Sequence, residues 1–227
     1  MRVLHYTIDT YVYFPSFRSQ TSIKELGYEV KISRDSFGRR VYHTVLNNYK
    51  TELKGKGLYV IDSITSQPRL LYLIMKQRGV IDNNYNAIFE NEVDFYEYLI
   101  SELKLAGTKK KTPRRQAKSK FTFWVNGNGN APYIQIGELF PIATGFIKKV
   151  KRQNYKDCAA LLHRQEASIW IDDLLENIPV EFALPVHDSL IVKKEDLQTV
   201  LRYCKDKYPD LRFDCEKLDN LKPETAE

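Results

Sequence analysis

Two apolar, β-prone segments, 184–186 and 190–192, bracket the sequence His187-Asp188-Ser189. This pattern predicts two short buried strands joined by a tight turn, with the Asp188 carboxylate at its tip. A carboxylate on a strand turn is held rigidly, and a metal ligand needs that rigidity. The alternative is a surface hairpin in which Asp188 only forms the turn, and this segment alone supports the two interpretations equally.

A second carboxylate ends another apolar run. Residues 57–62 predict a buried strand that ends at Asp62, and Pro68 then begins a helix whose buried face comes from residues 70–75. Carboxylates at two neighbouring strand ends could hold two Mg²⁺ ions, which at a separation of about 3.5–4 Å activate an attacking oxygen and stabilise a leaving one. Asp62 could instead cap the following helix, and spacing alone leaves both roles open.

The third feature is the basic segment 109–120, which an apolar, aromatic run follows. Thr112 is a good N-cap, and Pro113 suits a first helical turn. Arg114 and Lys118 stand four residues apart and therefore share one helix face, where two cations can grip a triphosphate. Such a charge run is otherwise a solvated face or a tail for nucleic acid. The proline and the aromatic run favour an ordered helix with a buried side.

Three of these segments resemble sequence motifs of family A DNA polymerases. The fingers-helix motif R-R-x-A-K-x-x-x-F-x-x-x-Y-G is similar to Arg114-Arg115-Gln116-Ala117-Lys118 followed by Phe121-Thr122-Phe123 and Gly127. The palm motif V-H-D is similar to Val186-His187-Asp188, and the first palm motif D-Y-S-Q is similar to Asp62 followed by Ser66-Gln67.

Two further segments agree with the family in their order along the chain. The G-R-L…P-N-L-Q segment near the thumb–palm junction is similar to Phe37-Gly38-Arg39-Arg40, with Asn47 and Asn48 downstream. The Q-x-x-A helix is similar to Gln165-Glu166-Ala167. The resemblance extends over roughly residues 35 to 215.

The resemblance implies a role for each set of residues. Asp62 and Asp188 would carry two catalytic Mg²⁺ ions, with Mn²⁺ as an alternative, and Arg114 and Lys118 would bind the phosphates of the incoming nucleotide. A further set would reach the minor groove at the primer terminus, where donors can meet the acceptors that all base pairs share. That set comprises Arg39, Gln165 and His187.

Departures from the family pattern bear on the choice of sugar. Ser66-Gln67 lies two residues farther from Asp62 than in the family, and Arg69 aligns with the glutamate that follows Ser-Gln there. Asn126 aligns with the fingers tyrosine, and Ser189 follows the His-Asp pair as in single-subunit phage-type RNA polymerases. We therefore expect Arg69 to lie beside the nucleotide sugar and discrimination against ribonucleotides to be weak.

Composition agrees with a nucleic-acid partner. The chain of 227 residues carries a net charge of +6, and its 15 tyrosines suit stacking on bases as well as packing. Its three cysteines have no metal-binding spacing and fit free thiols in a reducing cytoplasm. No signal peptide or membrane-spanning run is expected, so we expect a cytoplasmic protein without a membrane partner.

The expected fold is α+β: a right-hand polymerase palm, with an antiparallel sheet and packed helices, plus small helical fingers. The length implies a reduced or absent thumb, which a partner protein could replace. The expected divisions are an N-terminal, thumb-like segment (1–55), a first palm segment (56–80), fingers (81–150) and a second palm segment (151–227). Within them we expect strands around residues 11–14 and 211–215, and helices over residues 90–105, 155–176 and 194–207.

The expected activity is template-directed extension of a nucleic-acid primer from nucleoside triphosphates, of the kind needed for DNA replication in a phage, plasmid or mobile element. One alternative is an RNA-synthesising or template-independent relative. Another is a non-catalytic nucleic-acid-binding protein that keeps the palm shape, because a fold does not guarantee a function. The presence of both Asp62 and Asp188 favours an enzyme.

Overall fold

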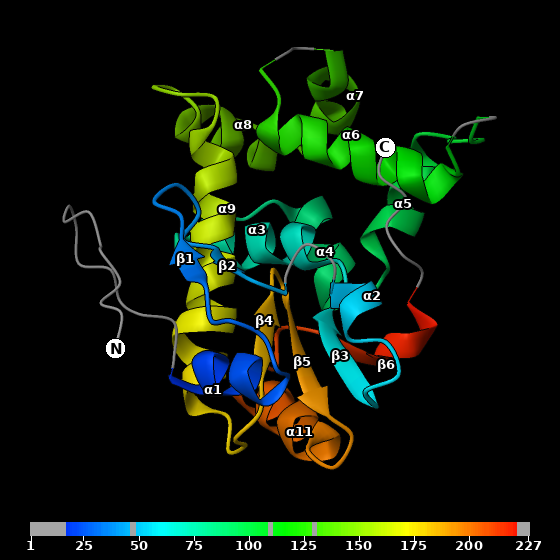
Figure 1. The fold of residues 1–227 in the computed structure, drawn as a ribbon. Helices are drawn as coiled ribbons and strands as arrows, with labels where there is room; N and C mark the ends of the chain where they lie inside the picture. Colours follow the sequence, from blue (N-terminus) through cyan, green and yellow to red (C-terminus); the bar gives the residue numbers. More distant parts are fainter. Residues whose placement is uncertain (1–16, 46–48, 109–110, 129–130, 222–227) are drawn as a thin grey trace.

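The computed structural model describes residues 17–45, 49–108, 111–128 and 131–221 (Figure 1). Three expected features lie outside these ranges: the strand around residues 11–14, the residues Asn47 and Asn48, and positions 109–110 of the basic segment. No helix in the described ranges is long and apolar enough to cross a membrane.

A four-stranded antiparallel sheet forms one end of the molecule. Its strands are β3 (Leu58–Ser63), β4 (Leu184–Val186), β5 (Ser189–Lys193) and β6 (Phe213–Lys217), in the order β4-β5-β3-β6. β5 is buried over most of its length because alternate side chains enter two different cores. Leu190 and Val192 join the main core, and Ile191 joins a smaller core with Leu184 and Val186.

Each face of the sheet is covered by helix. On the side of the main core lies α11 (Leu197–Lys207), which buries Leu197, Val200 and Leu201. On the side of the smaller core lies α1 (Phe17–Glu25), which contributes Ile23. Figure 1 shows these helices and the sheet at one end of the molecule. Both faces of the sheet are thus packed against helices, and this packing holds in place the strands β4 and β5 that carry the 187–188 turn.

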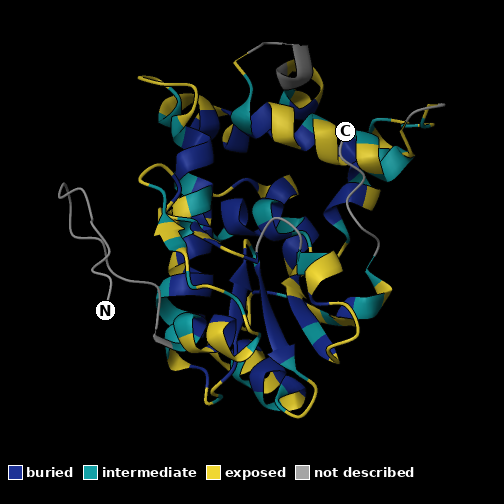
Figure 2. Ribbon diagram, in the orientation of Figure 1, coloured by how far each residue is buried: buried dark blue, intermediate teal, exposed yellow. Residues whose placement is uncertain are grey.

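The other end of the molecule is helical. It is built from α3 (Ser66–Gln77), α4 (Asn83–Glu90), α5 (Phe95–Glu102), α6 (Pro113–Asn126), α7 (Ala131–Leu139) and α8 (Pro141–Val150). Their interior is aromatic and includes Tyr85, Phe95, Trp124 and Phe140. Figure 2 shows buried and exposed residues alternating along the ribbon of these helices. The buried Asp82 joins two helices because its carboxylate accepts the N–H of Tyr85 at the start of α4 and those of Ile142 and Ala143 at the start of α8.

One long helical segment connects the two ends (Figure 1). It begins as α9 (Asp157–Ala167), continues as a π-helix, η2 (Ser168–Leu174), and ends as α10 (Leu175–Asn177). Within the π-helix, Trp170 packs edge-on against Phe213 of β6, at 5.7 Å between ring centroids. π-Helices are rare and often occur at functional sites. Here the π-helix directly follows Gln165 and Glu166.

A small hairpin lies on this long helix. Its strands are β1 (Ile32–Arg34) and β2 (Val41–His43), and the short helix α2 (Tyr49–Glu52) follows. Two ion pairs attach the hairpin: Arg34 to Asp172 at 2.7 Å and Arg40 to Glu166 at 2.7 Å. The loop between the strands therefore lies beside α9.

Several predicted elements are confirmed. β3 contains Asp62, β4 and β5 flank the 187–188 turn, and α6 begins after Thr112, whose side chain accepts the N–H of Arg115. α11 and β6 also lie where they were expected, β6 two residues later. The helix after Asp62 begins at Ser66, two residues before Pro68.

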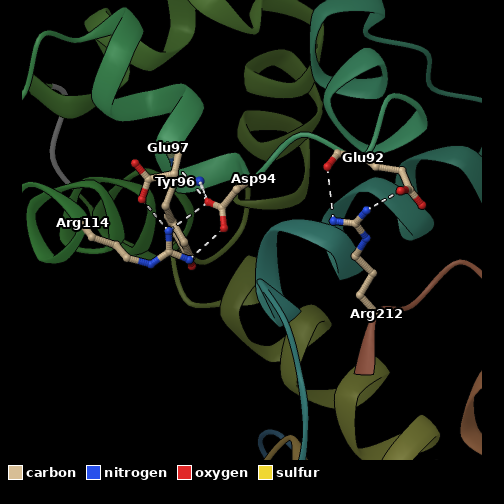
Figure 3. A network of polar contacts seen from close by, with 6 residues as sticks. All are labelled: Glu92, Asp94, Tyr96, Glu97, Arg114 and Arg212. Atoms are coloured by element: carbon tan, nitrogen blue, oxygen red, sulfur yellow. Dashed lines mark hydrogen bonds and ion pairs between the residues drawn. The ribbon is translucent and has the colours of Figure 1, made fainter. Parts of the chain in front are cut away.

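Three expectations about elements are wrong in some respect. The helix expected over residues 90–105 is shorter, α5 over Phe95–Glu102, because the chain breaks after α4 ends at residue 90: Glu92 has a φ of 58° and Asp94 caps α5. Arg212 holds that break by donating to the Glu92 carbonyl and pairing with its carboxylate (Figure 3). The helix expected over residues 155–176 contains the π-helix, and the N-terminal segment expected as strands and turns contains α1 and α2 as well.

Candidate active site

The pairing of β3 with β5 brings Asp62 and Asp188 together. Asp62 lies directly opposite Ser189 in the antiparallel ladder, and Asp188 is the residue before Ser189. The two carboxylates are close enough for the charge of Asp188 to raise the pKa of Asp62. Two residues far apart in the sequence thus meet at the end of two neighbouring strands.

The turn that carries Asp188 has an unusual backbone. Val186 pairs with Ser189, which leaves His187 and Asp188 as a two-residue turn. His187 has a φ of 53°, at a position in two-residue hairpins that glycine commonly takes. The Ser189 hydroxyl closes the turn by donating to the Val186 carbonyl at 2.7 Å. A non-glycine residue in this conformation is often found at functional sites.

Asp62 is exposed to solvent, yet neighbouring protein atoms desolvate its carboxylate. This burial, reinforced by the charge of Asp188, raises the pKa of Asp62 to about 7. The Ser63 N–H, which donates to Asp62 at 2.7 Å, and the charge of Lys118 act in the opposite direction. A carboxylate of this kind gains from a nearby cation, because a cation favours its ionised form.

Two further carboxylates border the pair. Asp214 lies opposite Asp62 on β6 and is exposed. Glu166 is buried, and burial raises its pKa to about 7 although Arg40 pairs with it. In the described portion of the chain, no three His, Cys, Asp or Glu side chains are grouped to hold a metal ion. The pair Asp62 and Asp188 nevertheless fits Mg²⁺, which commonly takes one or two carboxylates and completes its shell with water and substrate phosphates.

Helix α6 brings its cations toward this pair. Lys118 is exposed and close enough to Asp62 to lower the pKa of that carboxyl group. Arg114 lies one turn earlier and is held by α5: its Nη2 is 2.9 Å from Asp94, and its Nη1 is 2.8 Å from Glu97. Figure 3 shows the guanidinium between these two carboxylates.

Tyr96 is a site residue that sequence reasoning missed. Its ring lies below both cations, 5.4 Å from the Arg114 guanidinium carbon and 5.6 Å from Lys118 Nζ, and the charge of Asp188 influences its phenol. Tyr96 is buried on α5, and burial raises its pKa strongly. In the sequence it looks like one more core aromatic residue, so no local signal distinguishes it.

The three residues expected at the primer terminus lie on three different elements. Arg39 is exposed at the tip of the β1–β2 hairpin with a φ of 59°, Gln165 is half-buried on α9, and His187 is exposed at the strand turn. His163 of α9 lies near the hairpin loop and His187: an added Cβ on Gly38 would lie 2.7 Å from the His163 Cβ, and burial, with Arg40 and His187 nearby, lowers the pKa of His163 to about 4. His163 is therefore neutral near pH 7.

Arg69 lies in the interior rather than beside an open site. It is only 5% exposed, its Nη1 donates to the Asp210 carbonyl at 2.9 Å, and its guanidinium carbon lies 5.1 Å from the Phe89 ring. This placement counts against the expected contact between Arg69 and a nucleotide sugar. The longer spacing after Asp62 is consistent with it, because residues 63–65 first extend β3 and then turn into α3.

The fold is similar to that of a DNA polymerase domain. The POL domain of Pol1 from M. smegmatis, solved in complex with DNA primer-template and dNTP, matches with a TM-score of 0.61 at 14% sequence identity. The match covers 84% of this chain and 48% of that chain, so this chain spans about half the length of the polymerase domain. No protein-family model and no curated protein sequence matches the chain.

Proposed function

We propose that this chain is a template-directed nucleotidyltransferase that extends the 3′ end of a nucleic-acid primer. The single observation that carries the proposal is the register of β3 and β5, which places Asp62 beside Asp188 and within electrostatic reach of Lys118. The likeness to a polymerase domain supports the same conclusion at the level of the fold. A pure nucleic-acid binder has no need of two adjacent carboxylates at a rigid strand turn.

In the proposed reaction the primer 3′ oxygen attacks the α-phosphorus of a nucleoside triphosphate, and pyrophosphate leaves. Asp62 and Asp188 would hold two Mg²⁺ ions, which when bound supply charge for the attacking and leaving oxygens. Lys118 and Arg114 would bind the triphosphate, whose negative charge their cations offset. Asp62 must be ionised to serve as a ligand, so its raised pKa makes the site sensitive to pH near neutrality.

The primer–template is the proposed macromolecular partner. Arg39, Gln165 and His187 would supply the donors for contact with the minor groove near the primer end; Arg39 and His187 are exposed and Gln165 is half-buried. The net charge of +6 favours association with nucleic acid. Contacts of this kind test the geometry of the base pair and do not read the sequence.

Primer extension tests the proposal directly. DNA and RNA templates are tested separately, each with dNTPs and with NTPs, in the presence of Mg²⁺ or Mn²⁺. The combination that supports extension identifies both the template and the product. Asp62→Asn and Asp188→Asn are expected to lose extension by at least about a hundredfold. Asp206→Asn, which changes an exposed carboxylate on α11, is the matched control and is expected to extend normally. Extension that survives in Asp188→Asn would contradict the two-metal assignment.

The same assay separates the two alternatives. An RNA-synthesising enzyme would extend with NTPs, and Ser189 after Asp188 is the observation that favours it. The Ser189 hydroxyl is buried and bonded to the Val186 carbonyl, so it acts in the turn and not as a metal ligand. A non-catalytic protein would bind primer–template yet extend it with neither set of nucleotides.

A further inference from the structure

Both Nη atoms of the Arg114 guanidinium are bonded to carboxylates at the start of α5. Nη1 donates to Asp94 Oδ1 at 3.1 Å and to Glu97 Oε1 at 2.8 Å, while Nη2 donates to Asp94 Oδ2 at 2.9 Å (Figure 3). A fork held by two carboxylates imitates the way in which guanidinium binds phosphate. A phosphate that binds through both Nη atoms must therefore share or replace one of these partners.

The two carboxylates differ in how firmly they are held. Asp94 is the N-cap of α5, since its Oδ1 also accepts the N–H groups of Tyr96 and Glu97 at 2.9 and 3.0 Å. Burial alone would raise the pKa of Asp94, but the hydrogen bonds from Arg114 and the backbone outweigh it and lower the pKa. The Glu97 side chain is 59% exposed and meets Arg114 through one oxygen.

The two cations share one support. Arg114 and Lys118 both lie over the ring of Tyr96, which is 8% exposed and forms a floor beneath them. Lys118 is also close enough to Asp62 to lower its pKa, whereas Arg114 is paired with Asp94 and Glu97. A ligand that needs both cations must therefore compete with two carboxylates for Arg114.

We propose that Asp94 is a positioning residue that fixes the Arg114 fork, and that Glu97 is an exchangeable partner that nucleotide phosphates displace. The strength of the Glu97–Arg114 pair then sets the affinity for nucleotide. This inference rests on the proposed function, in which Arg114 binds the triphosphate. A triphosphate replaces Glu97 readily because it brings more charge and more acceptor oxygens to the same donors.

Binding of inorganic tripolyphosphate, measured by calorimetry without metal at low salt, tests the exchange apart from catalysis. Glu97→Gln is expected to bind about 1.4- to 5-fold more tightly than the wild type, the range that corresponds to an exposed ion pair. Glu102→Gln removes the same charge from an exposed position on α5 and is the matched control. It is expected to change affinity less than Glu97→Gln does.

A double-mutant cycle assigns the effect to Arg114. In an Arg114→Ala background Glu97→Gln is expected to have no further effect, because its partner is gone. If the wild type does not bind tripolyphosphate, or binds it equally well in Arg114→Ala, both the phosphate role of Arg114 and this inference fail. If Arg114→Ala weakens binding but Glu97→Gln equals Glu102→Gln, only this inference fails.

The role of Asp94 is tested with a variant that keeps the N-cap of α5. Asp94→Ser preserves a side-chain acceptor for the N-terminus of α5 but removes the charge that holds Arg114. It is expected to raise the KM for nucleotide at least about threefold, while the Kd for primer–template stays unchanged. A purely structural role for Asp94 would instead leave the nucleotide KM unchanged or raise both constants together.

Discussion

At the scale of single residues, two carboxyl groups of the site, those of Asp62 and Glu166, are difficult to ionise. Burial and the charge of Asp188 raise the pKa of Asp62 to about 7, and burial raises that of Glu166 to about 7. Roughly half of each group is therefore protonated at neutral pH. A divalent cation can reverse this at Asp62, because binding releases the proton.

Mg²⁺ is expected to raise the melting temperature of the wild type, and to do so more at pH 8 than at pH 6. The reason is that the proton on Asp62 competes with the cation below its pKa of about 7. Differential scanning fluorimetry over a Mg²⁺ titration measures this effect. The stabilisation is expected to disappear in Asp188→Asn and to persist in Asp206→Asn. An equal shift in both variants would mean that the cation binds elsewhere.

Glu166 makes stability depend on pH in a defined direction. Its folded pKa of about 7 exceeds the ordinary glutamate value, so the folded state binds the proton more tightly, and stability is lost as pH rises through that range. Between pH 5 and 8 the wild type is expected to lose roughly 2–3 kcal/mol of unfolding free energy relative to Glu166→Gln. Urea unfolding of both proteins at each pH gives the difference. The titration of His163 is present in both proteins and cancels.

At the scale of elements, local sequence signals predict the features of the site that one segment determines. Thr112 and Pro113 set the start of α6, and the apolar segments around His187 and Asp188 set a hairpin. The sequence does not predict how α5 and α6 pack, and so does not predict the contact of Arg114 with Asp94 and Glu97. The burial of Arg69 is not predicted for a related reason, since it depends on Phe89 and Asp210 from other segments.

The close approach of the β1–β2 hairpin to α9 depends on the absence of a side chain at residue 38. In Gly38→Ala the added Cβ would lie 2.7 Å from His163 Cβ, so the hairpin must move away from the helix. We expect a loss of about 1–3 kcal/mol of unfolding free energy and weaker primer–template binding, because Arg39 moves with the hairpin. Chemical unfolding and fluorescence anisotropy measure the two effects.

Gly145→Ala is the control for that substitution. Gly145 lies in α8 with no atom within 4 Å of an added Cβ, and alanine favours a helix by up to about 1 kcal/mol. This variant is therefore expected to be at least as stable as the wild type and to bind normally. Equal behaviour of the two variants would contradict the tight hairpin contact.

At the scale of the whole molecule, the distribution of roles between its two ends determines how it should meet nucleic acid. The proposed catalytic pair projects from the sheet, the proposed phosphate-binding cations lie on α6, and the long helix containing α9 joins these ends (Figure 1). The proposed minor-groove residues come from three segments: Arg39 from the β1–β2 loop, Gln165 from α9 and His187 from the strand turn. A duplex that contacts all three would therefore meet basic residues from separate segments.

Primer–template binding is accordingly expected to weaken steeply with salt. A plot of log K against log salt concentration should be linear, and Arg39→Ala should reduce the magnitude of its slope by about 1 if Arg39 also neutralises a phosphate. Arg202→Ala changes an exposed arginine on α11, which lies beside the sheet and away from the β1–β2 hairpin in Figure 1, and should leave the slope unchanged. Equal slopes for Arg39→Ala and the wild type would restrict Arg39 to contacts with bases or sugars.

The π-helix within the long connecting helix has a consequence for insertions and deletions. Its wider turns set the rotational phase between the residues before Ser168 and those after Leu174. Asp172 pairs with Arg34 of the hairpin, and its neighbour Asp173 pairs with Lys207 of α11. Two successive side chains of the π-helix thus contact different elements. Because a π-turn holds about one residue more than an α-turn, loss of one residue here would restore an ordinary α-helix and leave the residues after Leu174 near their present phase. Loss of one residue from α9, which has no wider turn to absorb it, would turn everything downstream by about 100°.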